Sequence, residues 1–332
     1  RGLGDVYKRQ DWNVTAGFNI NFNRGKVDKL ADNVTGLYGT EWATSSTFPK
    51  SDYVLKEGRP VGLVRGLTAD GFYTTDDFTY ANGVYTLKEG VADVSSAVFP
   101  NYHLHNGMNE RPAGQLAYPG MAKFKDLNDD GIINDDDVDV IGDMTPVHTG
   151  GFNINATYKN FDLGLYFNWS YGNEIYNVNK LAALYGYKEG AVYENKLSIV
   201  KDCYKIYDVV NGELVALTTP EQLNAANANA KLPLAYSENG YVSTLGIEDG
   251  SYLRLNTLTL GYTLPKSMLQ KAGISNLRVY GSIYNVFTIT GYSGIDAEVS
   301  TSTSTKTYPQ LGMDWGTYPR ARSFVLGVNL SF

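Results

Sequence analysis

The sequence has few cysteines, few charged residues and no long apolar run. Its single cysteine, Cys203, excludes an intramolecular disulfide framework and a thiolate metal cluster. No stretch approaches the roughly 18 consecutive apolar residues of a transmembrane helix. The 28 basic and 35 acidic residues give a formal net charge of −7, and the basic residues are not clustered. We therefore expect no nucleic-acid partner.

Tyrosine and glycine are abundant instead, with 26 and 35 residues among 332, whereas only 19% of the residues are charged. This composition argues against disorder and favours β-structure. The chain begins at Arg1 without an initiator methionine or a signal segment, so we expect a fragment. The stretch Arg1–Gln10 reads like translated adaptor sequence, and we treat it as a non-native leader. The domain to be explained is then 11–332.

Alternation of apolar and polar residues is the main structural signal. Across Asp11–Asn23, large apolar side chains occupy one parity and Asn, Thr and Gly the other, which predicts a two-faced strand. Phe161–Tyr171 repeats the pattern, and Lys159–Asn160 predicts a tight hairpin to the strand before it. In Leu253–Leu264 the apolar parity switches, which predicts a β-bulge. Further expected strands are Phe152–Tyr158, Leu277–Phe287 and Ser323–Phe332, with weaker candidates at Val61–Ala69 and Gly120–Lys125.

The length of these strands and the spacing between them favour a membrane barrel. Ten to twelve residues is long for a soluble sheet and suits a tilted bilayer crossing. Short connections (159–160, 265–275) alternate with long ones (172–250, 291–320), as in outer-membrane barrels. Periodicity alone also fits a soluble sandwich. Aromatic residues gather at strand ends, as in interfacial girdles: Trp12, Tyr158, Phe161, Trp169, Tyr171, Tyr262 and the terminal Phe332.

Two short helices are expected inside the connection 172–250. Thr219 has the features of an N-cap, with Pro220 at the first helical position and Gln222 as the capping-box partner, so a helix should run to Ala230. Glu189–Tyr204 is the second helical candidate.

An acidic segment from Asp126 to Asp137 carries the spacing of a calcium loop. The sharp turn falls at Gly131, and Asp137 stands at position twelve, where a helix–loop–helix site has Glu. Hard oxygen ligands favour Ca²⁺ over zinc. An acidic surface turn without metal is the alternative. The candidate ligands are Asp126, Asn128, Asp130, the Ile132 carbonyl, Asn134 and Asp137.

No catalytic motif is present, since the sequence lacks a nucleophile elbow, a phosphate-binding loop and a dinucleotide fingerprint. We expect no enzyme and name no catalytic residue. Loop aromatics could stack on sugar rings, although ordinary packing is the simpler interpretation. They are Trp42, Tyr73, Tyr80, Tyr185, Tyr187 and Trp315.

Several motifs together resemble SusC/RagA-type TonB-linked outer-membrane proteins, over about Asp11–Phe332. Ala297 departs from the pattern, because the family usually has Pro in this loop. Besides the acidic segment followed by Val140-Ile141-Gly142, the motifs are Thr149–Phe152, Tyr158–Leu163, Ile247–Leu255, Thr259–Pro265, Asn285–Phe287, Asp314–Arg322 and Asn329–Phe332.

The resemblance implies an all-β fold, the last third of a 22-stranded transmembrane antiparallel barrel with long extracellular loops. It implies import of glycans or peptides across the bacterial outer membrane, with a SusD-like surface lipoprotein as partner. The N-terminal plug and the segment that contacts TonB would lie outside this chain. Seven or eight strands cannot form such a wall alone, so an open, curved sheet is expected. The alternatives are a small self-contained barrel with a structural or adhesive role, and a soluble calcium-binding β-protein that holds polysaccharide.

Overall fold

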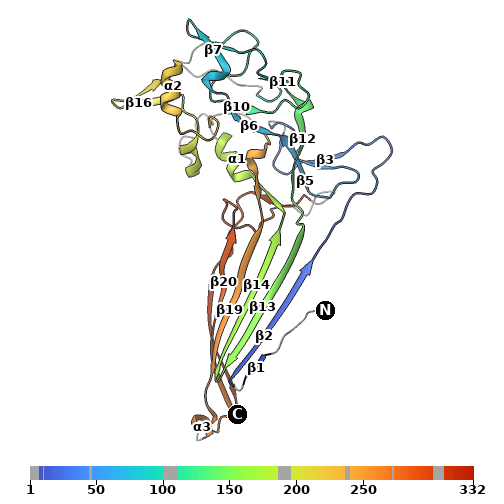
Figure 1. Ribbon diagram of the computed structural model, residues 1–332, viewed down its shortest axis with the longest axis vertical. Coiled ribbons are helices and arrows are strands. Elements are labelled where there is room, and N and C mark those ends of the chain that lie inside the picture. Colours follow the sequence, from blue (N-terminus) through green and yellow to red (C-terminus); the bar gives the residue numbers. More distant parts are fainter. Residues whose placement is uncertain are drawn as a thin grey trace.

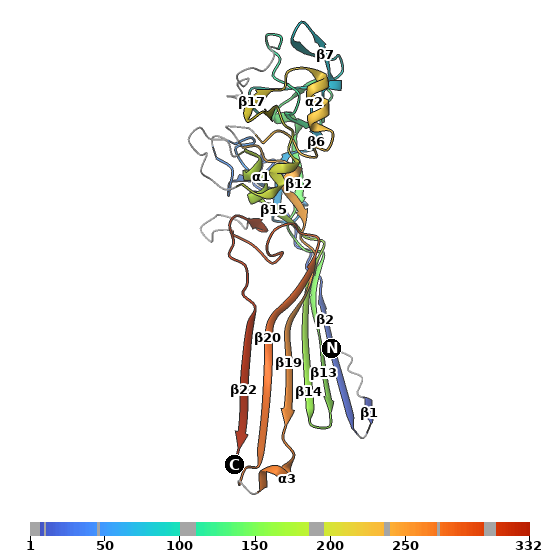
Figure 2. The same ribbon diagram turned by 90° about the vertical axis from the view of Figure 1, so that its left-hand side faces the viewer.

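A long sheet and a compact body above one of its ends make up the molecule (Figure 1). The computed structural model describes residues 7–9, 11–44, 47–99, 111–185, 196–235, 240–270, 273–301 and 310–332. Three long connections, 22–147, 172–251 and 291–322, form the upper part and are here called the loop body. The C-terminus lies at the opposite end of the sheet, beside the short turns (Figures 1 and 2).

The sheet has seven antiparallel strands in the order β1-β2-β13-β14-β19-β20-β22. The six strands expected from alternation are confirmed, as is the bulge, which appears as a register shift between Leu255 and Thr257. Lys159 adopts a left-handed conformation in the predicted hairpin turn. The bounds are β1 (Tyr7–Arg9), β2 (Trp12–Asn21), β13 (His148–Tyr158), β14 (Phe161–Tyr171), β19 (Tyr252–Thr263), β20 (Asn276–Thr290) and β22 (Ser323–Ser331).

Strand β1 is formed by part of the segment treated as a leader. Tyr7–Arg9 pair with β2 and extend the sheet by three residues. That Arg1–Gln10 is non-native stays a prediction. Within the described residues, β1 and β22 are the two edges and do not pair with each other, so the expected open sheet is confirmed and the barrel is not closed. No helix among the described residues is long and apolar enough to cross a membrane.

Side chains on the sheet sort into apolar and polar rows that run across the strands. One row joins Ala16, Ile154, Leu165, Leu258, Ile283 and Phe324 through directly paired positions. The adjacent row, one residue along each strand, joins Thr15, Asn155, Gly164, Thr259, Ser282 and Val325. Because neighbouring residues of a strand point to opposite faces, one face of the sheet is apolar and the other is largely polar. Below, these are called the apolar face and the polar face.

Aromatic residues mark both ends of the apolar face. At the short-turn end, the rings of Trp12 and Tyr158 lie 4.3 Å apart, and Phe161 and Tyr262 follow at 4.7 Å. At the end below the loop body, His148 stacks on Tyr171 at 5.0 Å. The apolar face between them is exposed, with Phe324 72% and Leu326 88% accessible. This arrangement matches an apolar band between two aromatic girdles.

The hydrophobic core lies in the loop body and not in the sheet. It includes a cluster of fully buried tyrosines, Tyr53, Tyr73, Tyr85, Tyr118 and Tyr176, packed with Val64, Leu67, Ile133, Leu181 and Leu223. Small sheets frame this core: β3 (Leu37–Gly39), β4 (Tyr53–Leu55), β5 (Leu63–Leu67), β6 (Ala69–Phe72), β7 (Phe78–Ala81), β8 (Val84–Leu87), β9 (Asp93–Val94), β10 (Ala122–Phe124), β11 (Ile132–Ile133), β12 (Val138–Asp143), β15 (Glu174–Asn177), β16 (Tyr207–Val210), β17 (Glu213–Ala216), β18 (Ile247–Asp249) and β21 (Met313–Asp314).

The two weaker strand candidates belong to this body. Val61–Ala69 forms β5 and the start of β6, and Gly120–Lys125 contains β10, which pairs with β6. Most of the side chains of β5 and β10 are buried, and both strands belong to small sheets outside the seven-stranded sheet.

The expected helix at Thr219 is confirmed, and the second helix is wrong where it can be compared. Helix α2 (Pro220–Asn227) begins after Thr219, whose side chain accepts from the Gln222 amide. Residues 186–195 lie outside the described part. Only a 3₁₀ turn, Ser198–Asp202, follows them, and α1 (Val178–Tyr185) lies earlier because Leu181 and Leu184 pack into the core. The other helices are α3 (Lys266–Leu269) and 3₁₀ turns at Thr75–Asp77, Asp135–Asp137 and Thr244–Gly246.

Candidate functional site

The polar face carries an ion pair near the short-turn end. The Arg278 Nε and Nη2 atoms donate to the two Asp162 carboxylate oxygens at 2.9 and 2.5 Å, across the intervening strand β19. A side chain on β19 would block this contact, since a Cβ at Gly261 would lie 2.4 Å from the Asp162 Oδ1 atom. Gly261 therefore leaves room on the polar face for a bidentate ion pair that joins β14 to β20 across β19.

At the other end, a buried arginine fastens the connection 291–322 over the polar face. Arg254 lies in the polar row of Asn168 and is 3% exposed. It pairs with Asp296, and its Nη1 atom lies 3.7 Å from the Glu298 Oε2 atom. The Arg320 Nη2 atom approaches the Glu298 Oε1 atom at 2.9 Å. We call these four residues the Arg254 cluster.

Two further contacts stabilise the same connection, one to the rest of the loop body and one within the connection itself. Glu248 accepts from the Ser293 amide and hydroxyl, both at 2.9 Å, and from the Lys180 ammonium at 3.1 Å. Burial opposes ionisation of Glu248, but these donors outweigh it and lower the pKa of the carboxyl. The Tyr292 hydroxyl donates to the Asp314 Oδ2 atom at 2.6 Å, and burial, together with Asp314, raises the pKa of Tyr292.

The departure at Ala297 leaves this loop well packed. Ala297 is 4% exposed and packs with Ile175 and Tyr292. The motif residues Arg254, Glu248 and Asp314 thus serve as anchors for one connection. Sequence reasoning found these motifs but not the long-range contacts between them.

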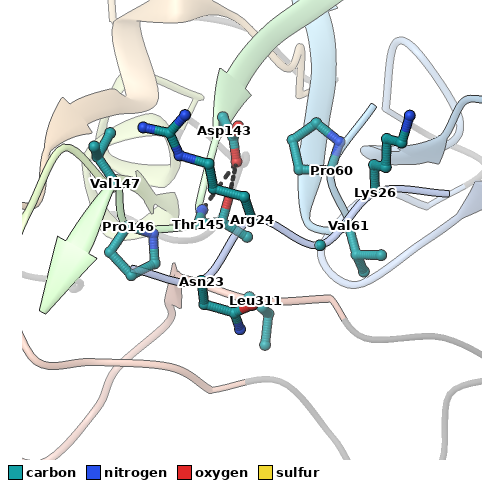
Figure 3. A pocket seen from close by; sticks show the side chains of 11 residues that line it. Asn23, Arg24, Lys26, Pro60, Val61, Asp143, Thr145, Pro146, Val147 and Leu311 are labelled. Atoms are coloured by element: carbon teal, nitrogen blue, oxygen red, sulfur yellow. Dashed lines mark hydrogen bonds between the residues drawn. The ribbon is translucent and has the colours of Figure 1, made fainter. Parts of the chain in front are cut away.

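An open cavity of about 690 Å³ lies where the strands meet the loop body (Figure 3). Asn23 and Val147 line it just beyond the ends of β2 and β13. Leu311, from the connection 291–322, closes another side. The cavity therefore lies at the junction between the sheet and the loop body.

The walls of this cavity combine apolar side chains with unpaired cations. Pro60, Val61, Pro146, Val147 and Leu311 supply the apolar part. Arg24 and Lys26 lie three and five residues beyond the end of β2 and are exposed, and their side chains point to different sides of Pro60 (Figure 3). Neither forms an ion pair with a described residue. The sequence pattern did not predict a role for these two cations. They lie in an irregular segment, and only the tertiary structure places them in the cavity wall.

The one carboxylate in the cavity wall already has partners. The Asp143 Oδ1 atom accepts from the Thr145 amide at 2.9 Å and from the Thr145 hydroxyl at 2.5 Å. The Asp143 amide in turn donates to the Glu174 Oε2 atom at 2.7 Å. Burial, with the nearby carboxylates of Asp143 and Asp249, raises the pKa of Glu174. The Asp143 carboxylate is thus hydrogen-bonded to Thr145, and a second carboxylate, that of Glu174, lies beside the Asp143 backbone.

The acidic segment forms an exposed loop on the loop body. The Asp126 carboxylate accepts from the Asp130 and Gly131 amides at 3.3 and 2.7 Å, and Asn128 donates to Asp130. Asp137 is buried, and its two oxygens accept from the Leu127 and Asn134 amides at 2.7 and 2.8 Å.

Asn134 caps the 3₁₀ turn through its side-chain oxygen, and its side-chain Nδ2 atom donates to the Ile132 carbonyl at 3.1 Å. No group of three or more His, Cys, Asp or Glu side chains is placed to hold a metal within the described ranges. The oxygens of Asp126 and Asp137 stabilise the loop through backbone donors, and calcium binding stays a prediction.

The loop aromatics are mostly structural where their side chains are described. Tyr73 is fully buried, and Trp42 packs against the tyrosine core. Tyr80 is 38% exposed but lies on the Tyr85 ring at 4.6 Å, whereas Trp315 is 49% exposed. The side chains of Tyr185 and Tyr187 lie outside the described part. Ordinary packing therefore accounts for Trp42 and Tyr73.

Comparison with known proteins places this architecture. No family model matches the chain. The chain is 30% identical over 328 residues to the TonB-dependent receptor P3 of Formosa agariphila. The alignment covers 97% of this chain and 27% of that protein. It is 28% identical over 256 residues to the TonB-dependent receptor SusC of Bacteroides thetaiotaomicron, covering 75% of this chain and 20% of SusC. The chain thus spans about a quarter of the length of the curated relatives that it matches.

Solved structures give the same result for the fold. The RagAB peptide importer in its closed-closed state superposes with a TM-score of 0.65 at 21% identity, covering all of this chain and 29% of the matched one. The open-open state gives a TM-score of 0.62 with 28% of the matched chain covered. The resemblance to the SusC/RagA-type family inferred from the motifs is confirmed.

Proposed function

We propose that this chain, which is related to TonB-dependent receptors of the SusC/RagA type over nearly its whole length, forms the C-terminal part of an outer-membrane importer. The observation that carries the proposal is the sorting of side chains into directly paired apolar and polar rows across six strands. An exposed apolar face between two aromatic girdles suits lipid, and the polar face suits a water-filled lumen.

The open sheet supports an importer wall more than a small self-contained barrel. Unpaired strand edges are not tolerated in lipid, so β22 and β2 need further strands beside them in the membrane. In this proposal the missing strands, the plug and the TonB contact come from a longer receptor. A SusD-like surface lipoprotein covers the loop body, and glycans or peptides pass along the polar face. The cargo crosses unchanged, so no catalytic residue is assigned.

The partner can be tested on the intact receptor. We expect a receptor purified from outer membranes in mild detergent to retain a surface lipoprotein encoded beside it. A continuous reading frame with a plug upstream of Asp11 is expected at the locus. Purification without any lipoprotein, together with a start codon and signal peptide just before Asp11, would contradict the proposal and favour the small barrel.

Calcium binding to the acidic loop is a separate prediction. Replacing Asp126 and Asp130 by Ala in the intact receptor is expected to abolish calcium binding at this loop, because both carboxylates supply ligands at the first and fifth positions of the spacing. Equilibrium dialysis with ⁴⁵Ca²⁺ measures the stoichiometry. The matched control is Asp129→Ala, which lies in the same loop at a position that the spacing does not use. Equal calcium uptake by the double variant and the wild type would refute the site.

A further inference from the structure

We propose that two side chains of β20, Tyr280 and Arg278, fix the register in which the last strands of the wall pair, because each lies across a glycine of a neighbouring strand. A Cβ at Gly327 on β22 would lie 2.3 Å from the Tyr280 Cζ atom. A Cβ at Gly261 on β19 would lie 2.6 Å from the Arg278 Nη2 atom. Neither distance leaves room for a side chain, so both glycines accommodate side chains that belong to β20.

The residues concerned form one continuous band on the polar face. Strand β20 lies between β19 and β22 (Figure 2), and Asp162, Gly261, Tyr280 and Gly327 are directly paired in a single row from β14 to β22. The Arg278 Cζ atom lies 4.7 Å from the centroid of the Tyr280 ring, and the same guanidinium bonds the Asp162 carboxylate beyond Gly261. The band therefore interlocks four strands through contacts made within the described residues.

Such contacts matter because the alternation of side chains leaves the register open. A slip by one residue moves every apolar side chain to the polar face, but a slip by two residues keeps both faces as they are. A tight turn can fix the register, as Lys159–Asn160 does between β13 and β14. The pairs β14–β19, β19–β20 and β20–β22 lack such a turn, since they are joined by 172–251, 264–275 and 291–322.

The contact between β20 and β22 is sensitive to the slip that alternation allows. A slip by two residues would bring Val325 or Asn329 opposite Tyr280 in place of the glycine, and both carry a side chain. At the other end of the same pair, the Arg322 Nη2 atom donates to the Val286 carbonyl at 2.7 Å. That bond does not distinguish registers, because every residue of a strand offers a carbonyl.

The ion pair across β19 is sensitive in the same way. A slip by two residues between β19 and either neighbour would move Arg278 along Asp162 by about 7 Å, too far for a hydrogen bond. It would also bring Thr259 or Thr263 beneath the guanidinium, since these residues flank Gly261 on the same face.

Disulfide trapping in the intact receptor measures the register between β20 and β22. Cysteines at the directly paired positions Ser282 and Val325 should cross-link in the native register. Cysteines at Ser282 and Ser323, or at Tyr284 and Val325, should cross-link only after a slip by two residues, one pair for each direction. Mass spectrometry of tryptic peptides identifies the linked residues. Cys203 is buried and stays in place.

Gly327→Ala is expected to lower the yield of the native cross-link about three-fold and to raise a slipped one, as expected for the loss of one cross-strand contact. The matched control is Gly281→Ala, which adds the same methyl group to this pair of strands on the apolar face. Its Cβ would lie 3.4 Å from the nearest atom, a Leu326 methyl group, so it should cross-link like the wild type. Tyr280→Ala should weaken the native register to the same extent, and adding Gly327→Ala to it should change nothing further.

Two outcomes would overturn the inference. An unchanged yield of the native cross-link in Gly327→Ala and in Tyr280→Ala would show that the register is set without this contact. An equal loss in Gly281→Ala would show that any added methyl group has the same effect. The import proposal is tested separately, by the lipoprotein that the receptor retains.

Discussion

Replacing Arg254 by methionine is expected to lower the free energy of unfolding by about 3–5 kcal/mol, the usual cost of breaking a buried ion pair by removing one partner. Arg254 is 3% exposed, and the Asp296 side chain facing it is 9% exposed. Without the guanidinium, Asp296 stays buried without its counter-charge, and Glu298 keeps only the exposed Arg320 as an ion-pair partner among the described residues. The connection 291–322 should then detach from the polar face.

This result can be measured by thermal unfolding of the intact receptor in detergent, with limited proteolysis within 291–322 as a local readout. Arg320→Gln is the control, because Arg320 is 47% exposed and its pair with Glu298 is worth at most about 1 kcal/mol. If both variants lose the same small amount, Arg254 is not the anchor of the connection.

Placing an arginine on the apolar face should damage assembly more than placing it one residue away. Ala16 and Thr15 are adjacent and both exposed on β2, but they belong to opposite faces of the sheet. Ala16→Arg would put a charge near the middle of the strand toward lipid, at a cost of about 2–4 kcal/mol. Thr15→Arg would place the same charge in the lumen, where water solvates it.

The readout is the amount of folded, heat-modifiable receptor in the outer membrane. We expect Ala16→Arg to reduce it strongly and Thr15→Arg to leave it near the wild-type level. Equal levels for the two variants would mean that the apolar face does not contact lipid, and a soluble β-sandwich would then be the favoured interpretation.

The strands of the wall could be predicted because their signal is local. A period of two requires only that successive side chains point to opposite faces, so Phe161–Tyr171 gave the bounds of β14 without reference to any partner. The same holds for the N-cap at Thr219, where the capping residues lie within three positions of one another. The helix expected at Glu189–Tyr204 failed where it is described, because burial of Leu181 and Leu184 favours an earlier segment.

The hydrophobic core of the loop body, in contrast, could not be predicted from local sequence patterns. Its core contains fully buried tyrosines such as Tyr53, whose hydroxyl donates to the Leu311 carbonyl at 2.7 Å, 258 residues away in sequence. A tyrosine in a loop can be exposed or buried, and burying its hydroxyl costs less free energy when an acceptor lies nearby; for Tyr53 that acceptor is far away in the sequence. The amino-acid composition therefore shows that tyrosine is abundant, but it does not predict that tyrosines form the hydrophobic core.

The sequence by itself determined the alternation, the turns, the bulge and the family resemblance, since each depends on residues close together in the chain or on motifs in fixed order. The tertiary structure alone decided that Arg254 meets Asp296 and that Arg24 and Lys26 border a cavity with Leu311. Those neighbours come from segments tens to hundreds of residues apart. Their meeting depends on strand register and on the folding of three long connections, which no local periodicity encodes.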